Sequence, residues 1–253
     1  GYGLNKKRIT EIKETGATLL ITVDCGISCH EEIAYASEIG LDVIVTDHHT
    51  VPEKTPDTAI AILHPKKPNC NYPFEELTGA GVALKLVNAL FKEYLPVSDV
   101  ESAMQKFSDL ATLGTVADLG PLVGENRIIV KHGLEQMKNS EWIGLKHLLD
   151  ICGIKEDEFL HTNHVSYRLA PRINAAGRIE SPYVALQLFL NKDEPAAAKA
   201  KQLEKINKQR QRLTEEIMIE AEQLVRKQLR HHNILIAYHP NWHPGLIGII
   251  AGR

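Results

Sequence analysis

The chain has 253 residues, of which 43% are hydrophobic and 24% charged, and its formal net charge is −3. A chain of this length can bury one large core or two smaller ones, so we expect a globular protein. The slightly acidic balance argues against a protein that coats nucleic acid with one broad basic surface, because affinity for phosphates comes mainly from clustered lysine and arginine. Any contact with nucleic acid is therefore expected to be local.

The sequence carries no signal for a membrane or for secretion. No apolar run approaches the roughly 18 to 20 residues that a membrane span needs, and the first ten residues lack the basic-then-apolar order of a signal peptide. The four cysteines, Cys25, Cys29, Cys70 and Cys152, form no CxxC pair and are expected to be reduced structural thiols. We predict a cytoplasmic protein with no membrane partner.

The first part of the chain predicts a βαβ unit. Apolar runs at 17–24 and 41–47 flank the amphipathic stretch 30–40, and short β-rich runs that alternate with a helix are typical of a parallel sheet. Polar residues directly after such strands lie at the carboxyl edge of the sheet, where open α/β sheets bind ligands. The residues expected at that edge are Asp24, Asp47, His48 and His49.

Further elements follow in chain order. Residues 59–65 predict another strand, residues 79–95 a helix that opens with the glycine-rich GAGVA, and residues 104–120 a second apolar helix that leads to Asp118. The stretch 161–182 is polar and punctuated by proline and glycine, and the run PRINAAGR within it, residues 171–178, is expected to be loop-like.

The last part predicts a long helix and then a new strand. Ala, Leu, Ile, Glu, Lys, Gln and Arg dominate the connector, and the apolar run NILIAYHP follows it. A second α/β domain is therefore expected to start near residue 233. The predicted division is a parallel-sheet domain at 1–155, a phosphate-contacting linker at 156–192, the connector helix at 193–232 and the start of the second domain at 233–253.

The side chains at the strand ends form a candidate metal site. Asp24 ends one strand and Asp47-His48-His49 follows the next, so adjacent parallel strands would bring them together. Carboxylate and imidazole ligands without a thiolate suit Mn²⁺ or Mg²⁺ better than a structural Zn²⁺. The alternative is that Asp24 caps a helix and the two histidines make local hydrogen bonds. Taken alone, the strand end at Asp24 favours this alternative, and so does the triplet Asp47-His48-His49.

Six short motifs resemble, in order, those of the DHH family of phosphoesterases and specifically its RecJ branch. They are VDCGIS at 23–28, VTDHH at 45–49, GAGVA at 79–83, GTVADLGPL at 114–122, SYRLAPRINAAGRI at 166–179 and NWHPGLIGIIAGR at 241–253. The resemblance covers essentially the whole chain, and six motifs in order are a far stronger signal than the triplet Asp-His-His. It implies an α/β DHH domain and, after the connector helix, a DHH-associated domain.

The resemblance also implies an activity. Members of this branch are hydrolases that remove nucleotides from the 5′ end of single-stranded DNA in recombination and repair, with two Mn²⁺ or Mg²⁺ ions in the site. The expected partners are single-stranded DNA with its 5′ terminal phosphate, a single-strand-binding protein and a helicase. The alternatives are a smaller DHH phosphoesterase that acts on short oligonucleotides or cyclic dinucleotides, and a replication scaffold without catalytic activity.

Residue roles are carried over by position. The residues that match the family's metal ligands are Asp24, His48 and Asp118. Asp118 lies inside GTVAD, which favours it over Asp109, the rival position by spacing. The residues that would complete the site or touch the scissile phosphate are Asp47 and His49.

A second group of residues is expected to bind the terminal phosphate. Arg172, Asn174 and Arg178 lie in PRINAAGR, where two guanidinium groups can fork onto phosphate oxygens and an amide can add a donor. The alternative is that the arginines form structural ion pairs with nearby acids. In the final motif small residues let backbone N–H groups approach an anion ahead of a helix, or they mark a plain turn. The residues expected to bind there are His243, Gly245 and Arg253.

The first half of the connector has a basic bias, which Glu204 alone relieves. Such a run is either a solvated helix face or a guide for the backbone of a DNA strand. The sequence leaves both interpretations open. The basic residues are Lys199, Lys201, Lys205, Lys208, Arg210 and Arg212.

The chain departs from the family in one respect. The family's first motif, an Asp-x-Asp strand end that supplies further metal ligands, is expected upstream of GYGL, and no Asp-x-Asp occurs in this chain. Because the chain starts without Met and stops at Arg253 directly after an apolar stretch, we expect both ends to be cuts through a longer gene product. We also expect this segment to be inactive by itself.

Overall fold

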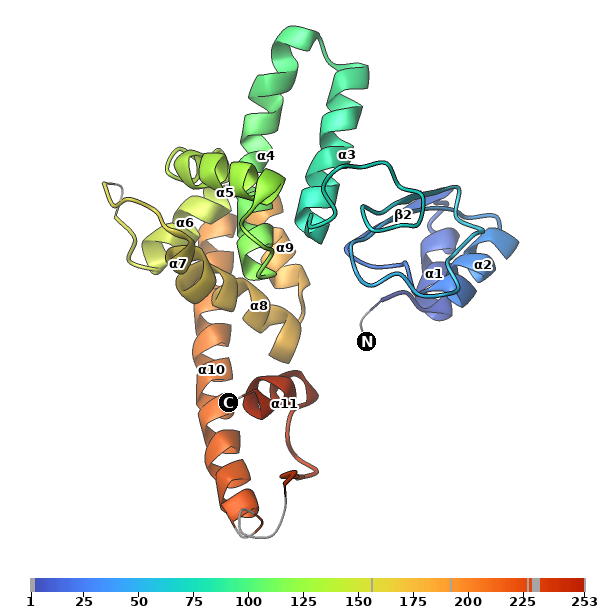
Figure 1. Ribbon diagram of the computed structural model, residues 1–253. Coiled ribbons are helices and arrows are strands. Elements are labelled where there is room, and N and C mark those ends of the chain that lie inside the picture. The colour runs from blue at the N-terminus through green and yellow to red at the C-terminus, as the bar shows by residue number, and fades with distance from the viewer. Residues whose placement is uncertain (1–2, 156, 192, 227, 229–232, 253) are drawn as a thin grey trace. The chain divides into compact units, whose positions relative to one another are not determined.

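The computed structural model describes residues 3–155, 157–191, 193–226, 228 and 233–252 (Figure 1). The residues gather into two compact units, Gly1–Asn139 and Ser140–Arg253. The elements of the first unit are α1 (Lys6–Glu14), β1 (Leu19–Val23), α2 (His30–Glu38), β2 (Asp42–Thr46), β3 (Ala61–Leu63), α3 (Gly79–Tyr94), α4 (Val97–Ala117) and α5 (Gly124–Met137). Those of the second are α6 (Ile143–Ile151), α7 (Thr162–His164), the π-helical turn η1 (Val165–Leu169), α8 (Ala170–Ile179), α9 (Tyr183–Leu190), α10 (Asp193–Arg226) and α11 (Pro244–Ala251).

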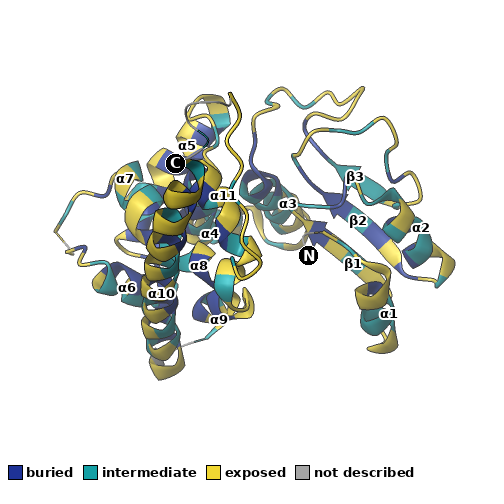
Figure 2. Ribbon diagram, turned by 90° about the horizontal axis from the view of Figure 1, so that it is seen from below, coloured by how far each residue is buried: buried dark blue, intermediate teal, exposed yellow. Residues whose placement is uncertain are grey.

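The first unit is built on a parallel sheet with the strand order β1-β2-β3, which confirms the predicted βαβ unit. Val23 pairs with Thr46 and Thr46 with Leu63, so the three strands end side by side. Figure 2 shows buried residues on the central strand β2. The core packed against α1 and α2 consists of Ile9, Ile33, Ala36, Leu41, Val43 and Val45.

Three helices of the first unit pack at close range. α3 and α4 run side by side as a hairpin in Figure 1, and α5 packs along α4. Glycines permit this approach: a Cβ on Gly114 would lie 2.4 Å from the Cβ of Ala80, and one on Gly133 would lie 1.9 Å from Oγ1 of Thr112. The predicted helices at 79–95 and 104–120 are confirmed, although the second begins earlier than expected, at Val97.

In the second unit, several shorter helices pack against the long helix α10. The compact units divide at residue 139, whereas the predicted first domain extends to residue 155. The difference arises from α6, whose apolar face, including the fully buried Leu145 and Leu148, packs against α9 and α10. The predicted long connector helix is confirmed as α10; residues 227 and 229–232 lie outside the described residues.

The prediction that PRINAAGR, residues 171–178, is loop-like is wrong, because α8 spans it and α7 and η1 precede it directly. Pro171 lies where the π-helical turn η1 joins α8, so its missing N–H falls at the junction of two helical hydrogen-bond patterns. Leu169, Ala170 and Ala176 are buried, and α8 packs against α10. Burial of this apolar face therefore outweighs the loop signals of proline and glycine.

The strand predicted near residue 233 is not formed within the described residues. A strand requires a neighbour with which to exchange backbone hydrogen bonds. The backbone of Ile236 instead bonds the side-chain amide of Gln228, which donates to its carbonyl at 2.7 Å and accepts from its N–H at 3.1 Å. Among the described residues, no helix combines the length and the apolar character needed to cross a membrane.

Candidate metal centre

The sheet places two acidic residues at the same edge. Asp24 follows β1, and its N–H donates to the carbonyl of Thr46 at 3.0 Å; Asp47 follows β2, and its N–H donates to the carbonyl of Leu63 at 3.1 Å. Asp24 adopts a φ of 61°, a conformation that non-glycine residues rarely adopt and that marks functional sites when it persists. The prediction that parallel pairing brings the ends of β1 and β2 together is confirmed.

Three side chains converge on the ring of His48. Its Nε2 atom lies 3.0 Å from Oδ1 of Asp24 and 3.5 Å from Oδ2 of Asp118. Ligand atoms of Asp24, His48 and His49 all lie within 4.8 Å of one another. Asp118 directly follows α4, whereas Asp109 lies fully buried in the same helix, about 13 Å away along the axis. The structure therefore places Asp118, and not Asp109, beside His48.

The chemistry of these atoms fits a divalent cation. Nε2 of His48 is buried, and among the described residues it forms no hydrogen bond of acceptable geometry, although two carboxylates lie close to it. Buried polar atoms in this condition are rare in folded proteins and call for an explanation such as an ion. The side chains of Asp24 and Asp118 are half-exposed, which leaves the site open to solvent. Oxygen and imidazole ligands suit Mn²⁺ and Mg²⁺.

The two carboxylates also act on the charge state of His48. The contact with Asp24 raises the pKa of His48 above its ordinary value, although burial opposes the shift, and the negative charge of Asp118 adds to the increase. The surroundings of this ring therefore favour positive charge. A metal ion bound at Nε2 would supply the positive charge that the two carboxylates favour, and the ring would then stay neutral.

Asp47 holds the turn that carries the two histidines. Its Oδ1 accepts hydrogen bonds from the N–H groups of His48 and His49 and lies 2.7 Å from Nδ1 of His49, and its Oδ2 accepts from the N–H of Ile27. Burial acts to raise the pKa of Asp47, but the hydrogen bonds outweigh it and lower the pKa. The residue is 1% exposed. Asp47 is thus placed to orient His49, whereas the exposed ring of His49 can reach a substrate.

The first glycine of GAGVA makes room for Asp24. A Cβ on Gly79 would lie 2.2 Å from Oδ1 of Asp24, so only glycine fits at this contact. Thr78 caps the helix by accepting a hydrogen bond from the N–H of Gly81 at 3.3 Å. The predicted helix start at GAGVA is confirmed, and its first glycine lies beside Asp24.

Of the residues expected to bind a terminal phosphate, Arg172 is held in an ion pair, whereas Asn174 and Arg178 are exposed. Nε of Arg172 donates to Glu204 of α10 at 2.6 Å and its Nη1 donates to the carbonyl of Arg168 at 2.7 Å. This is the structural ion pair that the sequence left open as an alternative. Asn174 and Arg178 are exposed four residues apart on α8, so they share one face of the helix.

α11 packs against the end of α8. Nη1 of Arg178 donates to the carbonyl of Gly245 at 3.2 Å, and a Cβ on Gly245 would lie 2.2 Å from the carbonyl oxygen of Arg178. His243 caps α11, because its Nδ1 accepts from the N–H of Gly245 at 3.1 Å. Gly245 thus permits close packing of α11 against α8 and lies in the first turn of α11. Arg253 lies outside the described residues.

One contact of the site was missed by sequence reasoning. His64 directly follows β3, and its Nε2 lies 2.9 Å from the carbonyl oxygen of His49. The only signal in the sequence was its place after a strand, the same signal that marked Asp24 and Asp47.

Comparison with known proteins agrees with this geometry. Residues 3–115 match the family described as DHH family, N-terminal domain. The single-stranded-DNA-specific exonuclease RecJ of Bacillus subtilis (strain 168) is 41% identical over 254 residues, which cover 100% of this chain and 31% of that protein. The chain is thus similar to the DHH family over residues 3–115 and to RecJ over its whole length.

Solved structures of RecJ share the fold of this RecJ-like chain. A crystal structure of exonuclease RecJ bound to manganese has a TM-score of 0.82 at 37% identity and covers 100% of this chain and 62% of that chain. RecJ from Thermus thermophilus in complex with Mn²⁺ also has a TM-score of 0.82, at 36% identity, with 98% of this chain and 36% of that chain covered. The chain spans between about a third and a half of the length of the curated RecJ relatives.

Proposed function

We propose that the protein containing this chain is a metal-dependent exonuclease that hydrolyses single-stranded DNA from its 5′ end during recombination and repair. The observation that carries the proposal is the group formed by His48 and two carboxylates, in which a buried imidazole nitrogen faces oxygen ligands without a hydrogen bond of acceptable geometry among the described residues. The names of the RecJ relatives support the substrate. A single-strand-binding protein and a helicase stay predicted partners.

Asp24, His48 and Asp118 would hold Mn²⁺ or Mg²⁺, the ions present in structures of RecJ. When bound, such ions would lower the pKa of a water molecule and would stabilise the attacking and leaving oxygens of the phosphodiester. The open side of the site lets the phosphate approach, because both aspartates are half-exposed.

The neighbouring residues of this chain supply orientation. Asp47 fixes the ring of His49 through Nδ1, so that Nε2 carries the lone pair when Nδ1 is protonated. His49 would then direct Nε2 to the metal or to the scissile phosphate. In the second unit, Asn174 and Arg178 on the exposed face of α8 would bind the terminal phosphate by hydrogen bonds, with the charge of Arg178 strengthening them.

Digestion of 5′-phosphorylated, 3′-labelled single-stranded DNA in the presence of Mn²⁺ tests the proposal. The protein is expressed from the complete reading frame and compared with His48→Ala and with a control, His132→Ala, which changes an exposed histidine of α5. We expect stepwise loss of 5′ nucleotides by the wild type and the control, and a rate at least about 100-fold lower for His48→Ala, because the variant lacks a metal ligand.

Two results would contradict the proposal. Binding of DNA without cleavage in Mn²⁺ or Mg²⁺ would indicate a scaffold that keeps the fold without the activity. Cleavage confined to dinucleotides would indicate one of the smaller DHH phosphoesterases.

A further inference from the structure

We propose that His64 is a positioning residue of the site: its ring holds the backbone of His49 and thereby fixes where the imidazole of His49 lies. The proposal rests on the proposed function for its kinetic consequences, but the contact itself can be measured without activity. His64 directly follows β3 and is 5% exposed.

The hydrogen bonds of His64 determine which of its two ring nitrogens carries the proton. The N–H of Lys66 donates to Nδ1 of His64 at 3.1 Å, and Nε2 lies 2.9 Å from the carbonyl oxygen of His49. Because Nδ1 accepts from an amide, it carries no proton, so the proton of the neutral ring is on Nε2. Nε2 therefore donates to the carbonyl of His49. Both nitrogens of the buried ring have a partner.

The contact completes the support of His49. Asp47 accepts a hydrogen bond from the N–H of His49 and holds Nδ1 of its ring, and His64 holds its carbonyl. Asp47 is itself tied to β3, because its N–H donates to the carbonyl of Leu63. Two consecutive residues at the end of β3 thus hold the turn at both of its ends. A site held in this way keeps the placement within about 0.5 Å that catalysis requires.

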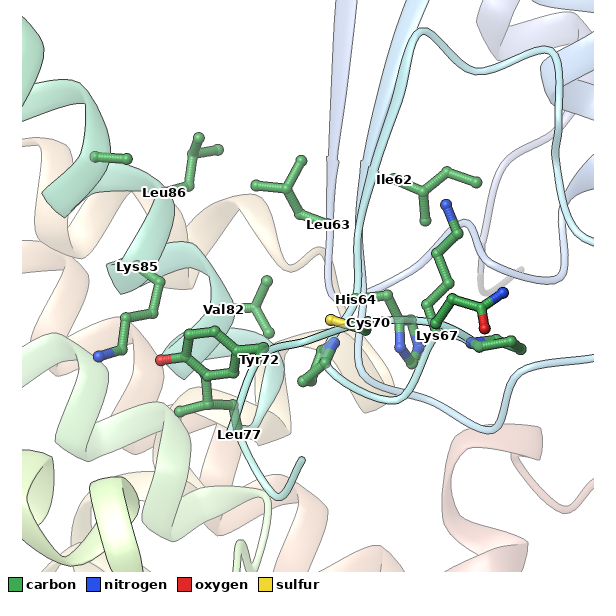
Figure 3. A pocket seen from close by; sticks show the side chains of 14 residues that line it. Ile62, Leu63, His64, Lys67, Cys70, Tyr72, Leu77, Val82, Lys85 and Leu86 are labelled. Carbon is green, nitrogen blue, oxygen red and sulfur yellow. The ribbon is translucent and has the colours of Figure 1, made fainter. Parts of the chain in front are cut away.

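The space beside His64 makes the contact testable. His64 borders a pocket of about 570 Å³ between β3 and α3, with Val82 and Tyr72 among its other walls (Figure 3). A leucine or glutamine at position 64 therefore has room and does not overpack the core. Leucine removes the donor, whereas glutamine offers a side-chain N–H at a similar reach.

Steady-state kinetics on single-stranded DNA distinguish positioning from stability. For His64→Leu we expect a kcat about 10- to 100-fold lower with KM within about 2-fold, as for other groups that orient a catalytic residue. For His64→Gln we expect recovery to within about 5-fold of the wild type. The control is Thr112→Val, which removes a buried side-chain hydrogen bond to the carbonyl of Ile129, within the packing of α4 and α5; it should lower the melting temperature and leave kcat unchanged.

Nitrogen NMR of the ring of His49 in the metal-free protein gives a second readout, which does not depend on nuclease activity. We expect one tautomer in the wild type and in His64→Gln, and a mixture in His64→Leu. A kcat of His64→Leu within about 3-fold of the wild type, or a glutamine variant no better than leucine, would overturn the proposal. If the wild type cleaves no DNA, the proposed function fails, and the NMR spectra alone decide: an unchanged His49 ring in His64→Leu would then overturn the role of His64.

Discussion

At the scale of single residues, the centre depends on a contact that leaves no room for a side chain. Asp24 adopts a left-handed conformation at the end of β1, and its carboxylate lies against the Cα of Gly79 at the start of α3. Glycine is therefore required at position 79 because the Asp24 carboxylate lies so close. The helix itself does not require it, since other residues could form its first turn. The close approach of the start of α3 to Asp24, rather than a flexible turn, explains this glycine.

Substitution Gly79→Ala tests the contact. The new Cβ would lie 2.2 Å from Oδ1 of Asp24, so the carboxylate must move away from His48. We expect Mn²⁺ affinity, measured by isothermal titration, to fall about 10- to 100-fold, while circular dichroism shows an intact fold. Gly248→Ala is the matched control, since a Cβ there meets nothing within 4 Å. An Mn²⁺ affinity unchanged by Gly79→Ala would show that Asp24 does not bind the ion.

At the scale of elements, the end of α4 delivers Asp118 to the site. After Asp118, the chain reverses at Leu119, which has a φ of 57°, and the N–H of Gly120 donates to the carbonyl of Thr115 at 3.0 Å. This is the Schellman pattern of a helix end, in which glycine usually occupies the left-handed position. Here a leucine occupies it with 82% of its surface exposed, so the strain is not offset by burial.

Relief of that strain is expected to stabilise the protein. Leu119→Gly removes the conflict between Cβ and the left-handed backbone, which amounts to about 1 kcal/mol, and it sacrifices little buried surface. We expect the melting temperature to rise by about 2 to 4 °C in a thermal unfolding experiment. Leu119→Ala keeps the Cβ and should not show the increase. A lower melting temperature for the glycine variant would show that the exposed leucine makes a stabilising contact.

At the scale of the whole molecule, charge is divided between the two units. Residues 1–139 contain 13 Lys and Arg and 19 Asp and Glu, whereas residues 140–253 contain 16 and 13, so the net charges of −6 and +3 give the −3 of the chain. An acidic unit attracts divalent cations and a basic unit attracts phosphates. In the first half of α10, four exposed basic residues recur every three or four positions on one face: Lys201, Lys205, Lys208 and Arg212.

This exposed face of α10 is expected to contact the backbone of single-stranded DNA. Each phosphate contact on a single strand contributes about −0.7 to the slope of log K against log salt concentration. The double variant Lys201→Gln/Lys205→Gln should therefore weaken binding and make the slope less negative by about 1.4, measured by fluorescence anisotropy. Lys92→Gln/Lys131→Gln, which changes two exposed lysines of the first unit, is the control. Equal slopes for the two double variants would support a solvated helix face.

The sequence alone determined the elements and residues whose signals are local. Short apolar runs around an amphipathic helix predict the parallel strands. The positions of Asp24 and His48 directly after those strands predict that they lie close together. The long helix α10 follows from composition over more than thirty residues. In each case neighbours in the sequence supply the physical cause, so no knowledge of distant contacts was needed.

Features that depend on residues far apart in the chain are set by packing and are visible only in the fold. Packing showed Asp47 buried among its hydrogen-bond donors, paired Arg172 with Glu204, and brought His64 to the carbonyl of His49. For Asp118, which the motif resemblance had already indicated as a ligand, it supplied the contact with His48. Residues 162–179 are helical, and burial of α8 against α10 stabilises this conformation. Packing determines the hydrogen bonds and the burial between distant segments, and the local pattern of a single segment does not predict that packing.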